Sequence, residues 1–335
     1  MQGAARRGPG EGARADFYAR IAEHQLAPLW EVIRTLLARE PTSEARPHVW
    51  RYAQTRPLLL ESGALISAEE AERRVLVLEN PGLPGASAVT ETLYASLQLI
   101  LPGEIAPAHR HSPAAIRFVL EGSGAYTAVD GEKAFMQPGD LVLTPSWCWH
   151  DHAHPGDGPM IWLDVLDLPL LRALGPRFAE DYPARQVPEM PTHGSVFRFP
   201  YAPRREELER LRRAGACDPC LGAKLEYLDA QTGGPALPTI SNFLQLLPSG
   251  FASRPYRATD ASIYCVFEGR GRTVVGRGES AVTLTWGPRD QFVVPRWQPH
   301  VHVCEEEAVL YSASDKGLQQ KLGLWREERG EASTA

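Results

Sequence analysis

The chain has 335 residues, of which 43% are hydrophobic and 23% charged, and its formal net charge is -6. This composition is typical of a folded globular protein, and the length exceeds what a single core usually supports, so two lobes are expected. The mixed charge argues against nucleic acid or an anionic membrane as the main partner. No apolar run reaches the roughly 20 residues of a membrane span, and residues 1–14 resemble a disordered tail rather than a signal peptide.

The five cysteines are odd in number and scattered along the chain. This pattern predicts no disulfide framework and a reducing, cytoplasmic compartment. Cys217 and Cys220 have the C-x-x-C spacing of redox and zinc sites, but no second pair accompanies them. Because a lone motif of this kind is weak evidence, a redox or metal role is the less favoured interpretation.

Apolar positions at helical spacing predict helix over residues 15–40, with Pro28 as a kink or as the start of a second helix. From Val75 onward the chain changes to short β runs separated by Gly and Pro, as in a sandwich or barrel. Residues 204–213, dense in Glu, Arg and Leu, predict a solvated helix in a connector.

A second β block begins near Pro238 and repeats the first. In each block a glycine precedes a Glu-Gly pair by the same interval, and a Pro-x-Trp-x-x-His motif follows. The matching positions are Gly103, Glu121 and Pro145-x-Trp147-x-x-His150 in the first block, and Gly250, Glu268 and Pro295-x-Trp297-x-x-His300 in the second. An internal repeat at this scale predicts one duplicated domain.

Three histidines of the first block are candidate metal ligands. His109 and His111 are two residues apart in a predicted strand, so both imidazoles can project from one face. His150 can add a third nitrogen from a neighbouring strand. Three neutral imidazoles suit Fe, Zn, Cu or Ni and leave coordination positions open for substrate and oxygen.

The second block lacks this set of histidines. Tyr256 and Ala258 stand where the first block has its histidine pair, and a lone His300 remains. The sequence therefore predicts a chemical site in the first block and a mainly structural role for the second.

Gly103-x5-His109-x-His111 and Gly139-x5-Pro145-x-Trp147-x-x-His150 resemble the two signature motifs of the cupin superfamily of double-sheet jelly-roll barrels. Ala115 and Ile116 occupy the place of the usual glutamate ligand, and Trp147 the place of a glycine. A duplicated cupin with three histidines and no glutamate is similar to the gentisate 1,2-dioxygenase family, which includes salicylate and 1-hydroxy-2-naphthoate dioxygenases. The similarity spans most of the chain, notably residues 72–82, 108–122, 126–132, 149–152 and 161–164.

This resemblance implies a mainly β bicupin fold, with two jelly-roll barrels from an internal duplication and an N-terminal helical segment. The expected divisions are a disordered tail (1–14), a helical arm region (15–85), a first cupin domain with the metal site (86–185), a connector with a helix (186–237), a second cupin domain without a complete metal site (238–325) and a C-terminal tail (326–335). The resemblance also implies a homotetramer.

The implied function is Fe(II)-dependent cleavage of an aromatic ring by O₂, with one iron per chain. Three imidazoles leave Fe(II) with more positive charge than a site of two histidines and a carboxylate. An anionic substrate that chelates through its carboxylate and an ortho hydroxyl should then bind well. For gentisate (2,5-dihydroxybenzoate), cleavage between C1 and C2 would give maleylpyruvate in aromatic catabolism.

Two arginines are candidates for holding the substrate carboxylate. Arg117 lies six residues after His111, so a regular strand would place it on the face of the ligands, where its guanidinium could pair with a carboxylate through two bonds. The alternative is an ion pair on the barrel exterior. Arg73 resembles a second arginine of the family, although the adjacent Arg74 could be the counterpart.

Other candidates have supporting roles. Gln98 could hydrogen-bond a substrate oxygen or O₂, and Asp164 resembles a family carboxylate that orients an imidazole. His152, or a water that it holds, is the candidate for acid–base help with a ring hydroxyl. His154 is expected in a solvated turn.

Three alternatives remain open at this level. One is activity on salicylate, substituted salicylates or 1-hydroxy-2-naphthoate, with Tyr94, Ser96 and Gln98 shaping the pocket. Another is a bicupin sensor or binding protein without turnover, which would not need three histidines and an arginine pair. The third is a metal-dependent isomerase, a class that more often keeps the glutamate ligand.

Overall fold

The computed structural model describes residues 11–191 and 195–330 and divides into two compact units, Met1–Thr42 and Ser43–Ala335. The first unit holds two helices, α1 (Glu11–Glu23) and α2 (Leu29–Leu36). Trp30 of α2 donates its indole N–H to the Tyr18 hydroxyl of α1 at 2.8 Å. Residues 11–14 therefore belong to a helix, which corrects the expected tail at 1–14; residues 1–10 lie outside the described part. No described helix is long and apolar enough to cross a membrane.

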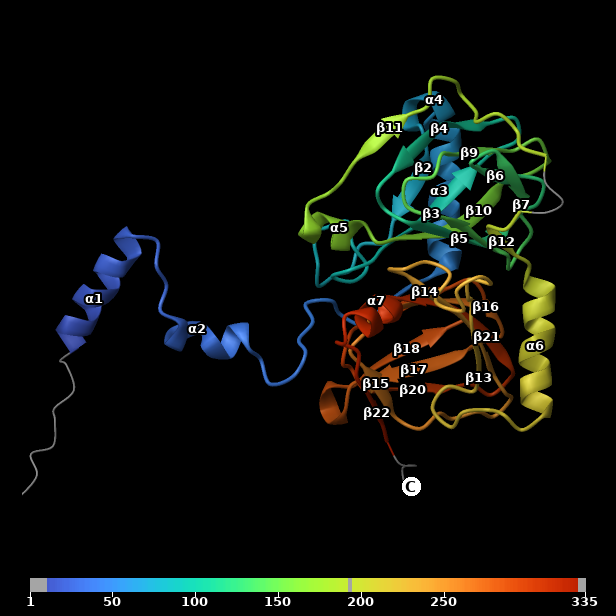
Figure 1. Ribbon diagram of the computed structural model, residues 1–335. Helices are drawn as coiled ribbons and strands as arrows, with labels where there is room; N and C mark the ends of the chain where they lie inside the picture. Colours follow the sequence, from blue (N-terminus) through green and yellow to red (C-terminus); the bar gives the residue numbers. More distant parts are fainter. Residues whose placement is uncertain (1–10, 192–194, 331–335) are drawn as a thin grey trace, which may run out of the picture. The chain divides into compact units, whose positions relative to one another are not determined.

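The second unit contains two barrels, each made of a six-stranded and a five-stranded sheet (Figure 1). In the first barrel the sheet orders are β12-β8-β5-β10-β3-β2 and β11-β4-β9-β6-β7. Its strands are β2 (Arg74–Val77), β3 (Tyr94–Ile100), β4 (Ile105–His111), β5 (Ala115–Glu121), β6 (Tyr126–Val129), β7 (Glu132–Phe135), β8 (Leu141–Thr144), β9 (His150–Ala153), β10 (Met160–Leu166), β11 (Ala179–Asp181) and β12 (Arg198–Phe199).

In the second barrel the orders are β1-β19-β16-β21-β14-β13 and β18-β17-β20-β15-β22. Its strands are β1 (His48–Trp50), β13 (Ala223–Glu226), β14 (Ser241–Leu247), β15 (Tyr256–Ala258), β16 (Ser262–Glu268), β17 (Gly271–Val275), β18 (Val282–Trp286), β19 (Gln291–Val294), β20 (His300–Val303), β21 (Ala308–Ser314) and β22 (Glu327–Arg329). The two barrels have the same strand order, so the predicted mainly β bicupin fold with an internal duplication is confirmed.

Helices and one 3-10 turn connect or cover the barrels. They are α3 (Tyr52–Leu65), α4 (Ala68–Ala71), α5 (Leu168–Leu174), α6 (Tyr201–Arg213), η1 (Gly278–Ser280) and α7 (Lys316–Lys321). Helices α5 and α7 follow equivalent strands, β10 and β21, and so belong to the duplication.

The expected helical arm at 15–85 is only partly helical. Strand β1 pairs with β19 at the edge of the second barrel, while β2 pairs with β3 at the edge of the first. The expected tail at 326–335 likewise contains β22, which pairs with β15. These short strands cover sheet edges that would otherwise expose unpaired N–H and C=O groups, and three or four residues are too few to show strand periodicity in the sequence.

One apolar core joins the barrels. Phe118 of β5 stacks on Tyr311 of β21 with ring centroids 4.2 Å apart, and meets the Phe267 ring edge-on at 5.5 Å. The alternate residues Ile116, Phe118 and Leu120 all belong to this core. Because successive strand residues face opposite sides, Ala115, Arg117 and Val119 point into the first barrel. This packing fixes which face of β5 lines the site.

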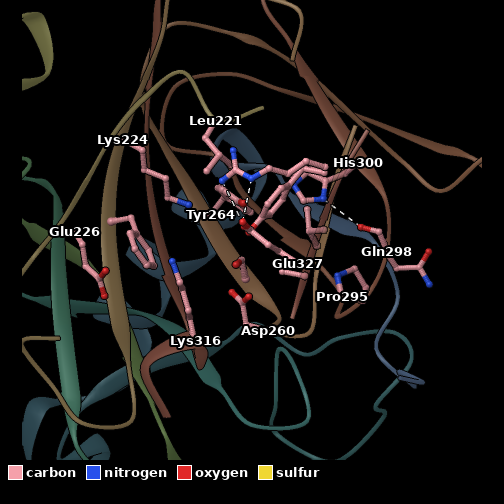
Figure 2. A pocket seen from close by; sticks show the side chains of 16 residues that line it. Leu221, Lys224, Glu226, Asp260, Tyr264, Pro295, Gln298, His300, Lys316 and Glu327 are labelled. Carbon is pink, nitrogen blue, oxygen red and sulfur yellow. Dashed lines mark hydrogen bonds and ion pairs between the residues drawn. The ribbon is translucent and has the colours of Figure 1, made fainter. Parts of the chain in front are cut away.

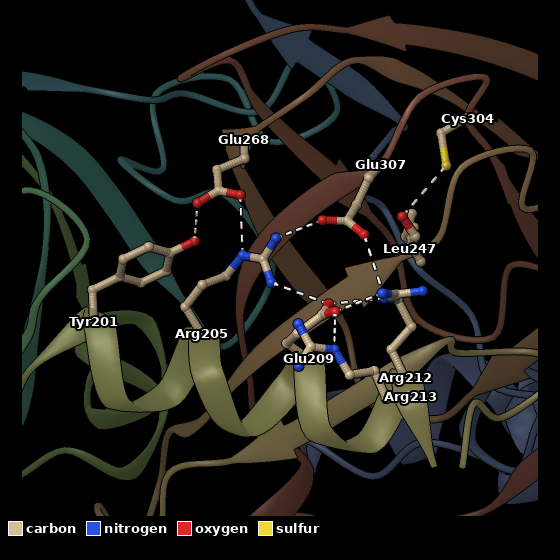
Figure 3. A network of polar contacts seen from close by, with 9 residues as sticks. All are labelled: Tyr201, Arg205, Glu209, Arg212, Arg213, Leu247, Glu268, Cys304 and Glu307. Carbon is tan, nitrogen blue, oxygen red and sulfur yellow. Dashed lines mark hydrogen bonds and ion pairs between the residues drawn. The ribbon is translucent and has the colours of Figure 1, made fainter. Parts of the chain in front are cut away.

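The glutamate of each repeated Glu-Gly pair receives an arginine from a helix. Arg56 of α3 donates to Glu121 at 2.8 Å, and Arg205 of α6 donates to Glu268 at 3.2 Å. Arg205 also pairs with Glu307, at 2.5 Å, and Figure 3 shows this contact beside that with Glu268. The connector helix α6 is therefore tied to the second barrel through its charged face, although the sequence predicts that this helix is only solvated.

Candidate metal centre and cavity

The structure brings His109, His111 and His150 together inside the first barrel. His109 and His111 lie on β4, and His150 lies on β9, directly opposite His109 in the strand register. The ring centroids are 4.2 to 5.1 Å apart, and one nitrogen from each ring lies within 4.8 Å of the others. A β-bulge between Ala106 and His109 re-aims the end of β4 toward the barrel interior.

Hydrogen bonds to backbone carbonyls orient two of these rings. The Nδ1 atoms of His111 and His150 lie 2.8 Å from the Pro113 oxygen and 3.1 Å from the Cys148 oxygen. A carbonyl can only accept, so each Nδ1 carries the proton and each Nε2 has a free lone pair. The Nε2 atom of His150 is buried and has no hydrogen-bond partner. Such an unsatisfied nitrogen inside a histidine triad fits a bound metal ion.

The site keeps its imidazoles neutral. Burial lowers the pKa of His109 to about 2 and that of His111 to about 4, and it holds the pKa of His150 well below the ordinary value. The nearby cations Arg73 and Arg117 act in the same direction. Neutral imidazole is the form that binds a metal, so no proton has to be displaced before coordination at neutral pH.

Arg117 lies inside the first barrel and is only 4% exposed, so the exterior ion pair considered for it is excluded. Its Nη1 donates to the Thr144 hydroxyl at 2.5 Å, and its Nε lies 3.6 Å from Asp164 Oδ1. Burial raises the pKa of Asp164 to about 6, partly offset by the Arg117 charge. The cation is thus held by one hydroxyl and one incompletely paired carboxylate.

Asp164 does not orient an imidazole, which corrects the role expected for it. Its Oδ1 accepts the indole N–H of Trp162 at 3.0 Å and faces Arg117. It is directly opposite Arg117 in the register of β5 and β10, so the sheet itself sets this pair.

Arg73 and Arg74 point to different places. Arg73 lines the cavity, donates to the Pro107 carbonyl at 2.7 Å and contacts Nδ1 of His109. Burial, together with the Arg117 charge, lowers the pKa of Arg73 to about 10. Arg74 is buried in an ion pair with Glu104 and does not line this cavity.

A cavity of about 220 Å³ adjoins the triad. Gln98 and Asp164 line it, and so do the two arginines, Arg73 and Arg117. Its remaining wall includes Val75, Tyr94, Ser96, Leu166 and Leu168. Two guanidinium groups face one carboxylate here, so the cavity has an excess of positive charge that suits an anionic ligand.

His152 and His154 are placed differently from expectation. His152 is fully buried behind His150, where its Nδ1 bonds the Thr127 hydroxyl at 2.9 Å and its ring packs 5.5 Å from that of Trp162. It is not among the residues that line the cavity, so direct acid–base contact with a ligand is not supported. His154 is also buried and bonds the Gly158 carbonyl, so it does not lie in a solvated turn.

The tryptophans beside His150 pack outside the cavity. Arg110, between the two histidines of β4, lies 4.5 Å from the Trp147 ring and 4.3 Å from the Trp149 ring, and it pairs with Glu180 of β11. Trp147 adopts a φ of 66°, which explains why cupins favour glycine there. The supporting residues Arg110, Thr127 and Thr144 were missed from the sequence because their roles depend on cross-strand neighbours.

The cysteines form no second centre in the part of the chain that the structure describes. All five are free, and Cys217 and Cys220 belong to no cluster of possible metal ligands. Among the described residues, the histidine triad is the only such cluster.

Comparison with known proteins places this site in a family context. The cupin domain family matches residues 96–166. The chain is 46% identical to gentisate 1,2 dioxygenase 1 of Aquipseudomonas alcaligenes, covering 94% of this chain and 96% of that protein. It is 35% identical to 5-aminosalicylate 1,2-dioxygenase of a Comamonas species, covering 92% and 88%. It also resembles the structure of salicylate 1,2-dioxygenase from Pseudoaminobacter salicylatoxidans with gentisate, with 30% identity, coverage of 97% and 96%, and a TM-score of 0.85.

Proposed function

The chain belongs to the gentisate 1,2-dioxygenase family of ring-cleaving cupin enzymes, and from this premise we propose that its own substrate is gentisate. The reaction is O₂-dependent cleavage between C1 and C2, which gives maleylpyruvate and incorporates both oxygen atoms. One Fe(II) per chain is held by His109, His111 and His150. The observation that carries this proposal is the meeting of three neutral imidazoles with the buried Arg117 and the half-buried Arg73 at one cavity.

The donor set suits ferrous iron. Three nitrogen ligands leave positions for a chelating substrate and for O₂, and when bound the ion supplies Lewis acidity and electron transfer between them. The chain contributes the rigid framework, because the carbonyls of Pro113 and Cys148 hold His111 and His150 with Nε2 toward the common point.

The two arginines bind the substrate carboxylate. Arg117 can offer a fork of N–H donors from a site where Asp164 neutralises it only partly, at 3.6 Å. Arg73 adds a second positive charge on the same cavity. The carboxylate of an aromatic acid would supply the negative charge that the two guanidinium groups lack. Burial strengthens the attraction between the carboxylate and the guanidinium groups.

Arg73 touches the triad as well as the cavity. Its guanidinium contacts Nδ1 of His109, and a hydrogen bond to the Pro107 backbone acts to raise the pKa of the same ring. If His109 held the metal through Nε2, its proton would have to lie on Nδ1, to which a guanidinium cannot donate. The Arg73 guanidinium would then be available to the substrate carboxylate.

Gln98 and the cavity wall orient the ring. Gln98 lies on β3 with its amide toward the cavity and donates to a substrate oxygen. Tyr94 and Ser96 lie on the same face of β3, four and two residues before Gln98, and limit which ring substituents fit. His152 acts through the packing of His150 and Trp162 rather than on the substrate.

One experiment tests this function. Anaerobic protein loaded with Fe(II) is mixed with gentisate, and air is then admitted. The expected result is a new near-ultraviolet band of maleylpyruvate, with one O₂ consumed per gentisate. Binding without product would instead indicate a bicupin sensor, and product without O₂ uptake would indicate isomerase chemistry.

Activity on salicylates is the second candidate, because a 5-aminosalicylate 1,2-dioxygenase and a salicylate 1,2-dioxygenase are similar to this chain over nearly its whole length. Salicylate lacks the hydroxyl para to the ortho hydroxyl, so ring activation would depend more on the metal and the protein. The same assay with salicylate, 5-aminosalicylate and 1-hydroxy-2-naphthoate ranks the substrates by kcat/KM. A value for any of these above that for gentisate would reassign the substrate.

The enzyme acts as a homotetramer in the cytoplasm. Helix α2 exposes large apolar side chains, namely Leu29, Trp30, Val32, Ile33 and Leu36, which favour burial against another subunit. Light scattering at micromolar concentration tests the assembly, and a monomer there would contradict it.

A further inference from the structure

The second barrel contains a cavity of about 240 Å³ (Figure 2). Its wall is built from β13, β14, β15, β16 and β20, with a contribution from helix α7. These elements are the counterparts of the ones that surround the metal centre in the first barrel. The duplication has thus kept a hollow at the same place in both barrels.

The strand registers align the two cavities residue by residue. Tyr256 is opposite His300 in the second barrel, as His109 is opposite His150 in the first. Ala258 lies two residues after Tyr256, at the position that His111 has relative to His109. Tyr264 of β16 occupies the position of Arg117 of β5. Tyr264 is opposite Ser312 of β21, as Arg117 is opposite Asp164 of β10. Two of the three histidines of the triad and the carboxylate-binding arginine are therefore absent from the second cavity, and only His300 remains.

Two lysines appear at positions that are apolar in the first barrel. Lys224 is opposite Gln245 in the sheet, as Val75 is opposite Gln98. Lys316 begins helix α7 as Leu168 begins helix α5. Val75 and Leu168 line the first cavity, and Lys224 and Lys316 line the second. The second cavity therefore has two ammonium groups at the positions where the first cavity has two apolar side chains.

These ammonium groups face the cavity without a carboxylate of their own. Both lie over the ring of Phe243, with Nζ of Lys224 at 4.3 Å and Nζ of Lys316 at 5.4 Å from its centroid. Within residues 11–191 and 195–330, neither lysine forms an ion pair, although Asp260 and Glu226 share the cavity wall. Burial and the neighbouring Lys316 lower the pKa of Lys224 to about 8, despite the opposing effect of Asp260.

Two of the three acidic groups on the cavity wall have other partners, whereas Oε1 of the third, Glu226, is buried without a hydrogen bond. Asp260 accepts the indole N–H of Trp325 at 2.8 Å, and Glu327 pairs with Arg329 at 3.0 Å. The three carboxylates on the wall, Glu226, Asp260 and Glu327, disfavour a doubly charged anion such as phosphate, while the two ammonium groups without an ion pair favour a single carboxylate.

The cavity also offers an acceptor. Nδ1 of His300 lies 3.2 Å from the Gln298 carbonyl, so this nitrogen carries the proton and Nε2 is left as an acceptor. A ligand hydroxyl can donate to it. The aromatic rings of Phe243 and Tyr264 supply a flat apolar wall between the two polar ends.

We propose that the second barrel is a binding site for a small hydroxycarboxylic acid, whose carboxylate lies between Lys224 and Lys316 and whose hydroxyl donates to His300. The site binds without a metal and is separate from the metal centre of the first barrel. Aromatic and aliphatic hydroxy acids share this chemistry, and the aromatic walls favour the former.

Lysine modification tests the proposal on the full chain. Chelator-treated protein is methylated reductively at pH 8, with and without millimolar 2,5-dihydroxybenzoate, and each lysine is followed by peptide mass spectrometry. A bound carboxylate raises the pKa of Lys224, and a rise from about 8 to about 9 alone lowers its reactive neutral fraction about fivefold. Lys321, exposed on the same helix as Lys316, is the internal control. No lysine lines the first cavity, so binding there cannot produce this protection.

The ligand series decides the chemistry. Hydroquinone, which lacks the carboxylate, should not protect, and malate in place of the aromatic acid identifies an aliphatic ligand if it protects at lower concentration. Equal protection by hydroquinone, stronger protection by inorganic phosphate, or no protection of Lys224 and Lys316 relative to Lys321 would each overturn the proposal.

Variants give an independent measurement. Lys224→Met should weaken 2,5-dihydroxybenzoate binding to chelated protein at this site about tenfold or more, while Lys321→Met leaves it unchanged. Both variants should keep the kcat/KM of the metal-loaded protein within about twofold, because distant sites act independently. Unchanged binding by Lys224→Met and by Lys316→Met would exclude the site even if the first barrel proves fully active.

Discussion

The two barrels of this chain have the same strand order but different chemistry. The first places three imidazoles and two arginines around its cavity, whereas the second has Tyr256 and Ala258 in place of the histidine pair and lysines on its walls. Both keep the apolar packing that closes a barrel. A handful of inward-facing positions therefore decides between a metal centre and an organic-anion site, while the framework tolerates either.

The comparison also separates supporting residues from reacting ones. His152 bonds Thr127 at 2.9 Å, and His302 bonds Thr273 at 2.8 Å in the barrel without a triad. The alignment of the two sequence blocks predicts His300 as the lone histidine of the second block, but His302 lies two residues after it. Because the His–Thr pair occurs with and without the metal ligands, it belongs to the framework of the barrel.

The largest difference between the barrels should come from the metal ligands. We expect His109→Ala, His111→Ala and His150→Ala each to lose bound iron and to lower kcat/KM about a thousandfold or more, with the fold retained. Two imidazoles cannot hold the ion as three do. The measurement is metal content together with circular dichroism.

The matched control is His300→Ala, which should leave iron near one per chain because Tyr256 and Ala258 cannot complete a second triad. Two irons per chain in the parent protein, or stoichiometric iron in any of the three alanine variants, would contradict the assignment.

The next effect concerns Arg117 and its counterpart Tyr264. Arg117→Lys keeps the charge but loses the two-point fork, at a cost of ~2–4 kcal/mol, or roughly 30- to 1000-fold in kcat/KM with iron unchanged. Arg117→Ala should be worse. Tyr264→Phe, at the equivalent position of the second barrel, should leave kcat/KM unaltered.

Kinetics and melting temperature are measured on the same samples. A stable, iron-replete Arg117→Ala protein with parental kcat/KM would show that the carboxylate is held elsewhere, and Arg73 would be the next residue to change.

A smaller effect is expected at the His–Thr pairs. His152→Asn should cost about 1–3 kcal/mol of unfolding free energy and about tenfold in activity, because it loosens the packing behind His150. His302→Asn should cost similar stability but leave activity nearly intact. If His152→Asn lost activity a hundredfold with unchanged stability and iron, a direct acid–base role would replace the framework role.

The smallest effect is a pH dependence specific to the first barrel. Burial raises the pKa of Asp164 to about 6, whereas its unfolded value is near 3.8. Between these values the folded Asp164 holds a proton that the unfolded chain has lost, so this group by itself lowers stability as pH rises, by at most about 1.4 kcal/mol per pH unit. The buried histidines, whose pKa values are lowered on folding, act in the opposite direction, so stability as a whole rises with pH.

Denaturant unfolding of metal-free protein from pH 4 to 7 measures this slope. Asp164→Asn should steepen the rise of stability with pH, because it removes the contribution that opposes the histidines. Ser312 occupies the equivalent position in the second barrel and cannot titrate in this range, so Ser312→Ala should leave the slope unchanged. An identical slope in Asp164→Asn would show that Asp164 does not titrate in this range.

The sequence alone determined the duplicated cupin fold and singled out the three histidines that meet in the first barrel. Both rest on local patterns: His-x-His places two rings on one face of a strand, and the repeated Gly, Glu-Gly and Trp-x-x-His spacings recur in each half. Both features follow from local spacing and need no knowledge of distant segments. Arg117 does point inward, but the six-residue count from His111 crosses the turn between β4 and β5, so the period of a single strand did not decide its direction.

Tertiary structure alone decided what each side chain meets. Arg73 rather than Arg74 faces the triad, Asp164 pairs with Arg117 rather than an imidazole, and His152 lies behind the cavity wall. Cross-strand register and depth within the barrel set these contacts. The lysines of the second barrel give a further example, because Lys224 of β13 and Lys316 of α7 line one cavity although they are 92 positions apart in the sequence. Sequence spacing carries no information on contacts closed by such distant segments, which form only when the whole barrel packs.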